Sequence, residues 1–359
     1  MSAQTTYDDP ELPDQLLALR DRIDAVLETF LSTKAREADK ARLPSDYMDA
    51  LHSFVFTGGK RTRPLLCVLG WFAAGGSERI PTAIVRAASS LELYHAAVLI
   101  HSDIIDDAEL RRGNLPLYRA MSARYAERPD ADRFGRHAAT LLGNLALNWS
   151  DELLNTAHLT ARQRAAAVSI VSTMRADVIY GQFLDLRAVA RSEVDLAEAL
   201  RIIRYKVVAY TCERPLELGA SMAGASAETR GALVSYARLL GEAFQLNRDL
   251  SGAFEDLRRG RHTMVVGLAL QRADSLRQCE LRRLLGDPAL DEGGAQRCRD
   301  ILTATGAQSE VARMVTQRRN QALLALDRAP MPSPAVAALR LLAQRLTHPF
   351  PIPTPRSAR

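Results

Sequence analysis

The amino-acid sequence predicts an all-α protein, and three observations lead to that prediction. Apolar residues recur at spacings of three and four along nearly the whole chain, which is typical of amphipathic helices. Aromatic residues make up only 6% of the chain, and Val, Ile and Thr do not form the short alternating runs of a β-sandwich or barrel. No change of composition and no repeat of about 20–50 residues divides the 359 residues, so we expect one large helical domain.

The first expected helix begins after a proline, in LPDQLLALRDRIDAVLETFL (12–31). Turn-rich breaks at TGGKR, AGGSER, AERPDADRFG, GDPALDEGGA and APMPSP separate the later helices. We expect those helices at 43–55, 62–74, 80–105, 137–156, 161–188, 194–222, 227–256, 263–284, 308–328 and 333–346. Residues 1–13 and 346–359 are polar and proline-containing, so we expect them to be disordered tails on either side of a single domain of residues 14–345.

Composition and charge exclude several classes of protein. The net charge is +5, yet the basic residues are dispersed, which is not the pattern of a nucleic-acid-binding groove. No apolar stretch approaches the roughly 18 residues of a membrane helix, and the N-terminus lacks the basic and apolar regions of a secretory signal. We therefore expect a cytoplasmic protein without a membrane span. The four cysteines lack metal-binding spacing and are expected to be reduced and structural.

The strongest local motif, HSDIIDDAELRRG (101–113), ends a segment that is apolar on most faces. A helix of that kind is buried in a bundle, so acids at its end are expected to line a cavity. Ser102 and Asp106 are four residues apart, as are Asp103 and Asp107, so their oxygens project from adjoining faces of one helix. Carboxylate oxygens suit Mg²⁺, which bridges to diphosphates. Taken alone, the segment is equally compatible with a solvated, charged helix end.

Cationic residues accompany these acids. Arg111 and Arg112 offer planar groups suited to phosphate oxygens. In TGGKRTRP (57–64), two glycines at an expected helix start precede three cations, namely Lys60, Arg61 and Arg63. Backbone N–H groups, the helix dipole and these charges together favour an anion, although an ordinary helix start explains the segment as well.

Three further motifs follow in the second half of the chain. MRADVIYGQFLDL (174–186) places Gln182 and Asp185 one turn apart on an otherwise apolar helix, and a buried acid of this kind needs a cation or a metal. YKVVAY contains Lys206, one of only four lysines beside 43 arginines. The third motif is GEAFQLNRDLSGAFED (241–256).

The order and spacing of these motifs, from about residue 45 to 275, resemble the trans-isoprenyl diphosphate synthases (polyprenyl synthases). The resemblance implies an all-α bundle around a deep apolar cavity, a homodimer, and Mg²⁺-dependent transfer between an allylic diphosphate and isopentenyl diphosphate. In such chemistry, metals and cations stabilise the departing diphosphate while apolar walls exclude water from the carbocation.

The resemblance also implies roles for individual residues. The residues that match the isopentenyl diphosphate site are Lys60, Arg63, His95 and Arg112. Those that match metal-binding acids are Asp103, Asp106, Asp185 and Asp249. Those that match contacts to the allylic diphosphate, or accompany them, are Arg111, Gln182, Lys206, Phe244 and Gln245. Among these we expect Lys206, Arg111 and Gln245 to be catalytic.

The sequence departs from the family pattern at both Asp-rich motifs. Ser102 replaces the first acid of the first motif, and we expect Asp107 to be recruited to the metal by a small rotation. Arg248 and Gly252 replace acids of the second motif. A phosphate-binding Lys that usually follows Asp256 is missing, and the Thr after the Lys at 206 is Val207.

Three functions are compatible with these departures. The first is a chain-elongating synthase in which Arg248 binds substrate and supplies charge that a third Mg²⁺ normally supplies. The matches to the isopentenyl diphosphate site favour it, because a cyclase has no need of that site. The second is a class I terpene cyclase that acts on one prenyl diphosphate. The third is an inactive or regulatory subunit of a synthase, which is motivated by the losses in both motifs.

The cyclase hypothesis depends on Asn247, Ser251 and Glu255, which have the spacing of a cyclase Asn-Ser-Glu metal triad. Alignment without gaps leaves Asn247 one residue early, about 100° around the helix. Arg248 also stands where a cyclase has an acid.

Product length is suggested by residues just before the first motif. Ala97 and Val98 are small, and Tyr94 lies a turn deeper. In the resembled family, small residues there let the chain grow and an aromatic residue closes the floor. We therefore expect a product of about C20, although Tyr94 is equally explained as a core residue.

Overall fold

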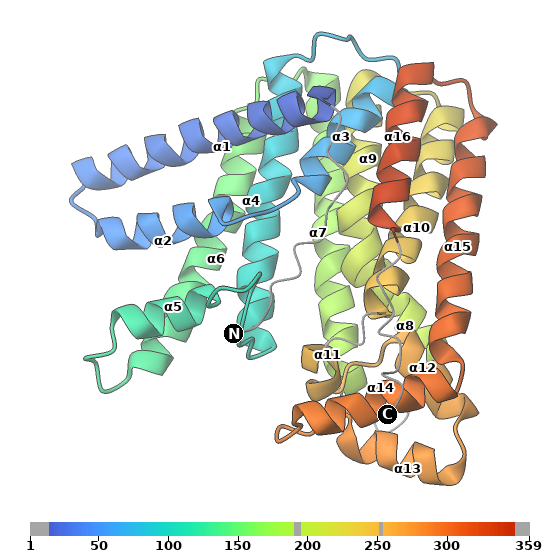
Figure 1. Ribbon diagram of the computed structural model, residues 1–359. Helices are drawn as coiled ribbons and strands as arrows, with labels where there is room; N and C mark the ends of the chain where they lie inside the picture. The colour runs from blue at the N-terminus through green and yellow to red at the C-terminus, as the bar shows by residue number, and fades with distance from the viewer. Residues whose placement is uncertain (1–13, 190–194, 251–253, 349–359) are drawn as a thin grey trace. The chain divides into compact units, whose positions relative to one another are not determined.

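The computed structural model describes residues 14–189, 195–250 and 254–348, and every regular element in those ranges is helical (Figure 1). The described residues contain no strand, and an isolated bridge joins Arg111 to Asn114. The prediction of an all-α protein is confirmed. The tails expected at 1–13 and 349–359 lie outside the described residues.

The chain divides into two compact units. The N-terminal unit comprises Glu11–Val68 and Gly76–Ala166. Its helices are α1 (Asp14–Lys40), α2 (Ser45–Phe56), α4 (Thr82–Ile105), α5 (Leu117–Arg124) and α6 (Ala131–Asn155). Helix α4 packs along α6, and α5 also packs on α6. The single domain expected over 14–345 stays a prediction.

Helix α4 is the core helix of this unit. Its buried side chains lie on all sides of the helix, which leaves it without a polar face. By length and composition α4 is also apolar enough to cross a membrane, and it is the one such helix among the described residues. However, 72% of its apolar window is buried inside the protein, as in the core helix of a bundle. A search for an unbroken apolar stretch in the sequence misses α4, because polar residues such as Glu92 and His95 interrupt its apolar sequence.

The C-terminal unit contains Leu69–Gly75 and Ala167–Arg359. Helices α3 (Thr62–Ala73) and α7 (Ala161–Val189) cross the boundary between the units along the chain. The other elements of this unit are α8 (Leu196–Ile202), η1 (Ile203–Glu213), α9 (Arg214–Ala223), α10 (Ala227–Asp249), α11 (Phe254–Arg258), α12 (Met264–Arg272), α13 (Ser275–Leu284), α14 (Glu292–Ala304), α15 (Ala307–Ala325), η2 (Leu326–Arg328) and α16 (Ser333–Leu346). Helix α10 packs along α15 and against η1.

Several expected helices are divided in the structure. The helical segment expected over 194–222 is present without a break over 196–223, but its middle part, η1, is a π-helix flanked by α8 and α9. The helix predicted over 263–284 breaks before Ser275, because the Asp274 side chain caps the N-terminus of α13. Helices α5 and α14 were not predicted, since both lie in stretches rich in turn-forming residues.

All four cysteines are free. Cys67, Cys212 and Cys298 are buried, whereas Cys279 is exposed. Burial raises the pKa of the Cys298 thiol to about 11, and it raises the pKa of Cys67 as well. The thiols of Cys67 and Cys298 are therefore protonated, unreactive core groups at neutral pH.

Candidate active site

The first Asp-rich motif lies at the C-terminal end of α4, where the apolar helix becomes acidic. The Asp103 side chain is only 1% exposed. Its carboxylate is bound by Arg111, whose Nε donates to Oδ1 at 2.9 Å and to Oδ2 at 3.1 Å, while Nη2 also contacts Oδ1. A buried carboxylate needs such a partner. Two residues predicted for the site are thus brought together as an ion pair.

The other oxygens of this motif have different partners. Ser102 Oγ donates to Asp106 Oδ2 at 3.2 Å, so the serine and the acid remain on one side of the helix. Asp107 lies past the end of α4 with φ of 47°. Its carboxylate accepts from Tyr118 at 3.0 Å and is bound by Arg136. The bond from Arg136 lowers the pKa of Asp107. In this arrangement Asp107 belongs to a cluster with α5 and α6, and its recruitment to a metal stays a prediction.

A tight turn after the motif carries the two arginines. Backbone hydrogen bonds link Arg111 and Asn114 in both directions, at 2.7 and 3.0 Å. The two residues between them, Arg112 and Gly113, have φ of 53° and 80°, as in a type I′ turn. Arg112 Nη1 then donates to the carbonyls of Thr57 and Gly58 at 3.0 and 2.9 Å. The arginine therefore joins this turn to the glycine loop that precedes α3.

Arg61 is the last residue of that glycine loop, immediately before α3. Its side chain is 4% exposed and forms ion pairs with Asp24 at 2.6 Å and Glu92 at 3.1 Å. Nη1 also donates to the carbonyl of Val55 at 3.0 Å. Burial alone lowers the pKa of Arg61, but Glu92 and Asp24 raise it overall. Sequence reasoning overlooked this role because Asp24 and Glu92 lie far from the loop along the chain.

His95, on α4, lies among the arginines of the N-terminal unit. Burial lowers the pKa of His95 well below its usual range, and the charges of four arginines lower it further, namely Arg63, Arg112, Arg111 and Arg61. His95 is therefore a neutral ring in a strongly positive environment. Lys60 is exposed in the same loop, while Arg63 is 9% exposed. The residues predicted to bind one diphosphate are thus assembled within a single unit.

The C-terminal unit contains a second acid–cation pair. Lys206 Nζ contacts Asp185 Oδ2, and the two side chains are 16% and 13% exposed. Gln182, one turn before Asp185, has a buried Nε2 with no hydrogen-bond partner among the described residues. Gly181 of α7 allows Lys206 and Asp185 to meet, because a Cβ at position 181 would lie 2.2 Å from the backbone nitrogen of Lys206. The lysine and the acid are therefore held where α7 and η1 pack closely.

The second Asp-rich motif ends α10. Asp249 is 7% exposed and accepts from Gln245 Nε2 at 2.7 Å. Burial raises the pKa of Asp249 to about 7. The hydrogen bond from Gln245 lowers this pKa by less than burial raises it, and the like charge of the nearby Asp256 raises it further. Asp256 itself is bound by Arg261 at 3.1 Å.

The two residues before Asp249, Asn247 and Arg248, have surroundings different from those of Asp249. The exposed Arg248 lies over the ring of Phe244, with its guanidinium carbon 6.0 Å from the ring centre. Asn247 is 3% exposed, and its Nδ2 donates to the carbonyl of His348 at 2.8 Å. This bond is a structural role for the first residue of the cyclase triad. Ser251 and Gly252, and the side chain of Glu255, lie outside the described residues.

The available ligands suit Mg²⁺ in chemistry. Asp103 and Asp106 in the N-terminal unit, and Asp185 and Asp249 in the C-terminal unit, offer hard carboxylate oxygens of the kind that Mg²⁺ prefers. No group of three or more His, Cys, Asp or Glu side chains converges as a metal site within the described ranges. The remaining ligands would then come from substrate and water, as Mg²⁺ commonly requires.

The regular elements of the described residues are helical, and carboxylates and cations suited to phosphate gather at helix ends. These features are typical of enzymes that act on diphosphates. Residues 45–302 match the family model described as Polyprenyl synthetase. Nonaprenyl diphosphate synthase of Mycobacterium tuberculosis is 29% identical, over 83% of this chain and 84% of that protein. Geranylgeranyl diphosphate synthase of Methanosarcina mazei is 27% identical, over 74% of this chain and 78% of that protein.

A solved structure agrees with these relatives. It is a geranylgeranyl pyrophosphate synthase from Corynebacterium glutamicum, complexed with isoprenyl diphosphate and magnesium. That protein is 33% identical, with a TM-score of 0.88, covering 94% of this chain and 99% of the other. The chain belongs to the polyprenyl synthetase family, the trans-isoprenyl diphosphate synthases, as its motifs predicted. It is an enzyme of the prenyltransferase class.

Proposed function

We propose that the enzyme condenses isopentenyl diphosphate with an allylic diphosphate in the presence of Mg²⁺ and makes a prenyl diphosphate of about C20. One observation carries this proposal. His95 on α4 is surrounded by arginine charge within the N-terminal unit, and Lys60 lies in the glycine loop of the same unit. A second acid–cation pair, Asp185–Lys206, belongs to the C-terminal unit. A synthase needs positions for two diphosphates, whereas a cyclase needs one.

In the proposed reaction the allylic C–O bond breaks and the diphosphate leaves with the electron pair. The isopentenyl double bond then attacks the allylic carbon, and the proton lost from the adduct goes to the departing diphosphate. Mg²⁺ would neutralise the diphosphate charge, and the carboxylates proposed as its ligands are Asp103 and Asp106 in the N-terminal unit and Asp185 and Asp249 in the C-terminal unit. Arg111 in the first unit and Lys206 in the second are the cations proposed for diphosphate, because a fixed cation stabilises developing charge without reorganisation. Gln245 orients Asp249 through its hydrogen bond.

The experiment is a product assay of the purified protein with Mg²⁺, read by mass spectrometry. One set of samples pairs isopentenyl diphosphate with a C5, C10, C15 or C20 allylic diphosphate, and a second set contains each allylic diphosphate alone. Longer diphosphates in the paired samples alone support the proposal. A hydrocarbon or alcohol from a single substrate would instead identify a cyclase. No product in any sample would favour a subunit that needs an active partner.

The proposed chain length depends on Tyr94 in α4. Its side chain is 4% exposed, and Ala97 after it is 2% exposed. We expect Tyr94→Ala to lengthen the product by at least one C5 unit, because the aromatic ring no longer blocks the growing chain. Ala97→Val is the matched control, and it should shorten the product or leave it unchanged. A Tyr94→Ala enzyme with unchanged product length would make Tyr94 a core residue only.

We also propose that the enzyme is a homodimer formed through α7. This helix exposes four large apolar side chains at helical spacing, namely Ile179, Tyr180, Phe183 and Leu186. Such a continuous apolar stripe is unusual on the surface of a monomer. Phe183→Glu should convert a dimer to a monomer in light scattering, and an unchanged mass would exclude this face. The cytoplasmic location stays a prediction.

A further inference from the structure

The segment that carries Lys206 has an unusual backbone. Residues Ile203–Glu213 form the π-helix η1, with Lys206 in its first turn. A π-helix is rare, and most examples are single-turn insertions in α-helices, frequently at functional sites. An element of 11 residues is longer than that. Specific side-chain contacts are therefore needed to keep it from becoming an α-helix.

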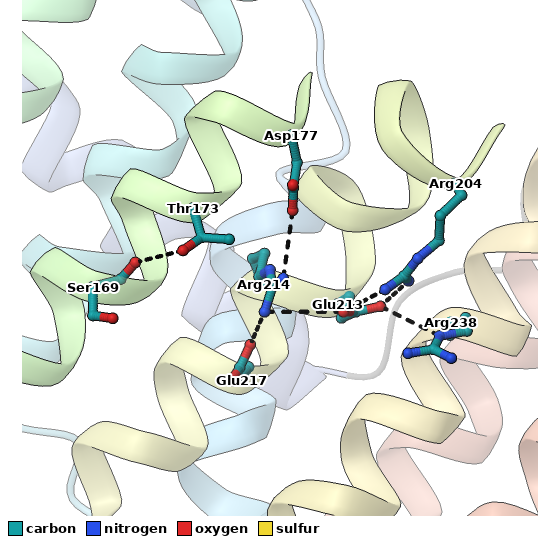
Figure 2. Close-up of polar contacts among 8 residues, drawn as sticks. All are labelled: Ser169, Thr173, Asp177, Arg204, Glu213, Arg214, Glu217 and Arg238. Atoms are coloured by element: carbon teal, nitrogen blue, oxygen red, sulfur yellow. Dashed lines mark hydrogen bonds and ion pairs between the residues drawn. The ribbon is translucent and has the colours of Figure 1, made fainter. Parts of the chain in front are cut away.

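One ion pair depends on the π geometry. Arg204 and Glu213 are nine residues apart, which in an α-helix at about 100° per residue places them on opposite sides. In a π-helix of about 4.4 residues per turn, nine residues complete nearly two turns and place them on the same side. Arg204 Nη2 donates to Glu213 Oε1 at 2.8 Å, and Nη1 contacts Oε2 (Figure 2). This two-pronged contact forms only while η1 is π-helical.

The acid of this pair lies in a balanced network of charges. The Glu213 side chain is 2% exposed, and its carboxylate is also 3.8 Å from Arg238 of α10 and 4.0 Å from Arg214. Arg214 in turn contacts Glu217 at 2.8 Å and Asp177 of α7 at 3.4 Å. Figure 2 shows Glu213 between Arg214 on one side and Arg204 and Arg238 on the other. The C-terminal end of η1 is thereby fixed to both neighbouring helices.

Close packing fixes the rest of η1. A Cβ on Gly181 of α7 would meet the Lys206 backbone at 2.2 Å, and one on Gly241 of α10 would meet Val208 at 3.0 Å. Asp177, Gly181 and Asp185 follow one another at four-residue intervals, so one side of α7 contacts Lys206 near the start of η1 and Arg214 immediately after its end. The backbone has little room to shift without moving Lys206.

We propose that the Arg204–Glu213 pair is a clamp that keeps η1 π-helical and so positions Lys206 against Asp185. Both are positioning residues for a lysine whose role rests on the proposed function. If η1 became α-helical, the change in twist over the seven-residue separation between Lys206 and Glu213 would rotate the lysine by roughly a third of a turn. The amine would then leave Asp185 and the diphosphate that it is proposed to hold.

The first test observes Lys206 directly, without any reaction. The chain has only four lysines, so a protein labelled with ¹³C at lysine Cε gives few NMR signals, and Lys206→Arg identifies one of them. We expect Arg204→Met to move the Lys206 signal toward that of the exposed Lys60. The control is Arg340→Met, which removes a half-exposed ion pair with Asp327 and should leave the signal in place. An unmoved Lys206 signal in Arg204→Met would overturn the proposal.

The second test is a double-mutant cycle in steady-state kinetics. We expect Arg204→Met to lower kcat about tenfold and to leave KM for isopentenyl diphosphate within about twofold, because misplacing one group affects the chemical step. In a Lys206→Met background the same change should have no further effect, since coupled residues are not additive. Losses that multiply would overturn the clamp. Arg204→Lys keeps one hydrogen bond and should recover part of the rate.

Two further provisions separate the possible failures. If Arg204→Met does not fold, Glu213→Asp replaces it in the NMR test. Glu213→Asp keeps the charge but shortens the side chain, and it should also move the Lys206 signal. If the wild-type enzyme transfers no prenyl group, the proposed function fails while the NMR test still decides whether the clamp positions the lysine.

Discussion

Asp103 and Asp249 are two buried carboxylates at the ends of long helices, and they are neutralised in different ways. Asp103, at the end of α4, is 1% exposed and is bound on both oxygens by Arg111. Asp249, at the end of α10, is 7% exposed and accepts from the amide of Gln245. Burial raises the pKa of Asp249 to about 7. Asp103 is therefore neutralised by a cation, and Asp249 is neutralised by a proton.

The difference shows what each acid must release before it can bind a metal. Asp103 must release Arg111, which the allylic diphosphate is proposed to attract. Asp249 must release a proton, so its affinity for a cation increases as the pH rises through about 7. The substitution at Arg248 does not remove this need, because the Arg248 charge lowers the pKa of Asp249 less than burial raises it.

The largest expected effect comes from removing the N-terminal acid. We expect Asp103→Asn to lower kcat/KM about a thousandfold, as loss of a central electrostatic group does. Asp107→Asn is the matched comparison and should have a much smaller effect, because Arg136 and Tyr118 already hold that carboxylate. Steady-state kinetics with saturating Mg²⁺ measure both. Equal losses would show that Asp107 is recruited to the metal in place of the acid missing at Ser102.

The proton on Asp249 predicts a pH-dependent stability of the metal-free protein. Its pKa is raised from 3.8 to about 7, so the folded state holds a proton that the unfolded chain releases. This contribution is fully present below pH about 4 and is lost as the pH rises to about 7. Asp249→Asn should therefore be more stable than the wild type at pH 8, by at most about 4 kcal/mol, and similar to it at pH 4. Urea unfolding with a chelator measures this difference.

Two results would contradict that prediction. A stability difference between Asp249→Asn and the wild type that stays constant from pH 4 to pH 8 would mean that Asp249 keeps an ordinary pKa. A variant that is less stable at pH 8 would mean that the ionised carboxylate has a favourable partner in the folded state.

A smaller effect is expected from restoring an acid to the first motif. Ser102 Oγ donates to Asp106, so an aspartate at this position would add a carboxylate beside two others. Because the affinity for a divalent cation increases with the charge of its ligands, Ser102→Asp should lower the Mg²⁺ concentration for half-maximal activity about fivefold. Ser102→Asn is the uncharged control. An unchanged midpoint in Ser102→Asp would place this residue outside the metal site.

The fold was predictable where a long apolar pattern has one period. Helix α7 was expected at 161–188 and extends over Ala161–Val189. Helix η1 was not predictable, because the ion pair that identifies this π-helix joins residues nine apart, a spacing that no ordinary helix pattern contains. Helix α5 is only 8 residues long and follows directly on the tight turn at Arg112.

The candidate site was predictable in its residue types but not in its pairings. The motifs identified the acids and cations, because their order and spacing along the chain resemble those of the family. They did not show that Arg111 contacts Asp103, since this depends on positive φ at Asp107 and Arg112, which turns the chain back toward the helix end. Nor did they show that Arg61 is buried between Asp24 and Glu92 rather than available to a ligand.

The buried cysteines give each unit its own record of transient opening. Cys67 belongs to the N-terminal unit and Cys212 to η1 in the C-terminal unit, while Cys279 is exposed. A thiol reagent should modify Cys279 at once and the buried thiols only as fast as their surroundings open. The ratio of the modification rates of Cys67 and Cys212 therefore reports which of the two units opens more readily. A diphosphate that tightens one half should slow one thiol and leave the other unchanged.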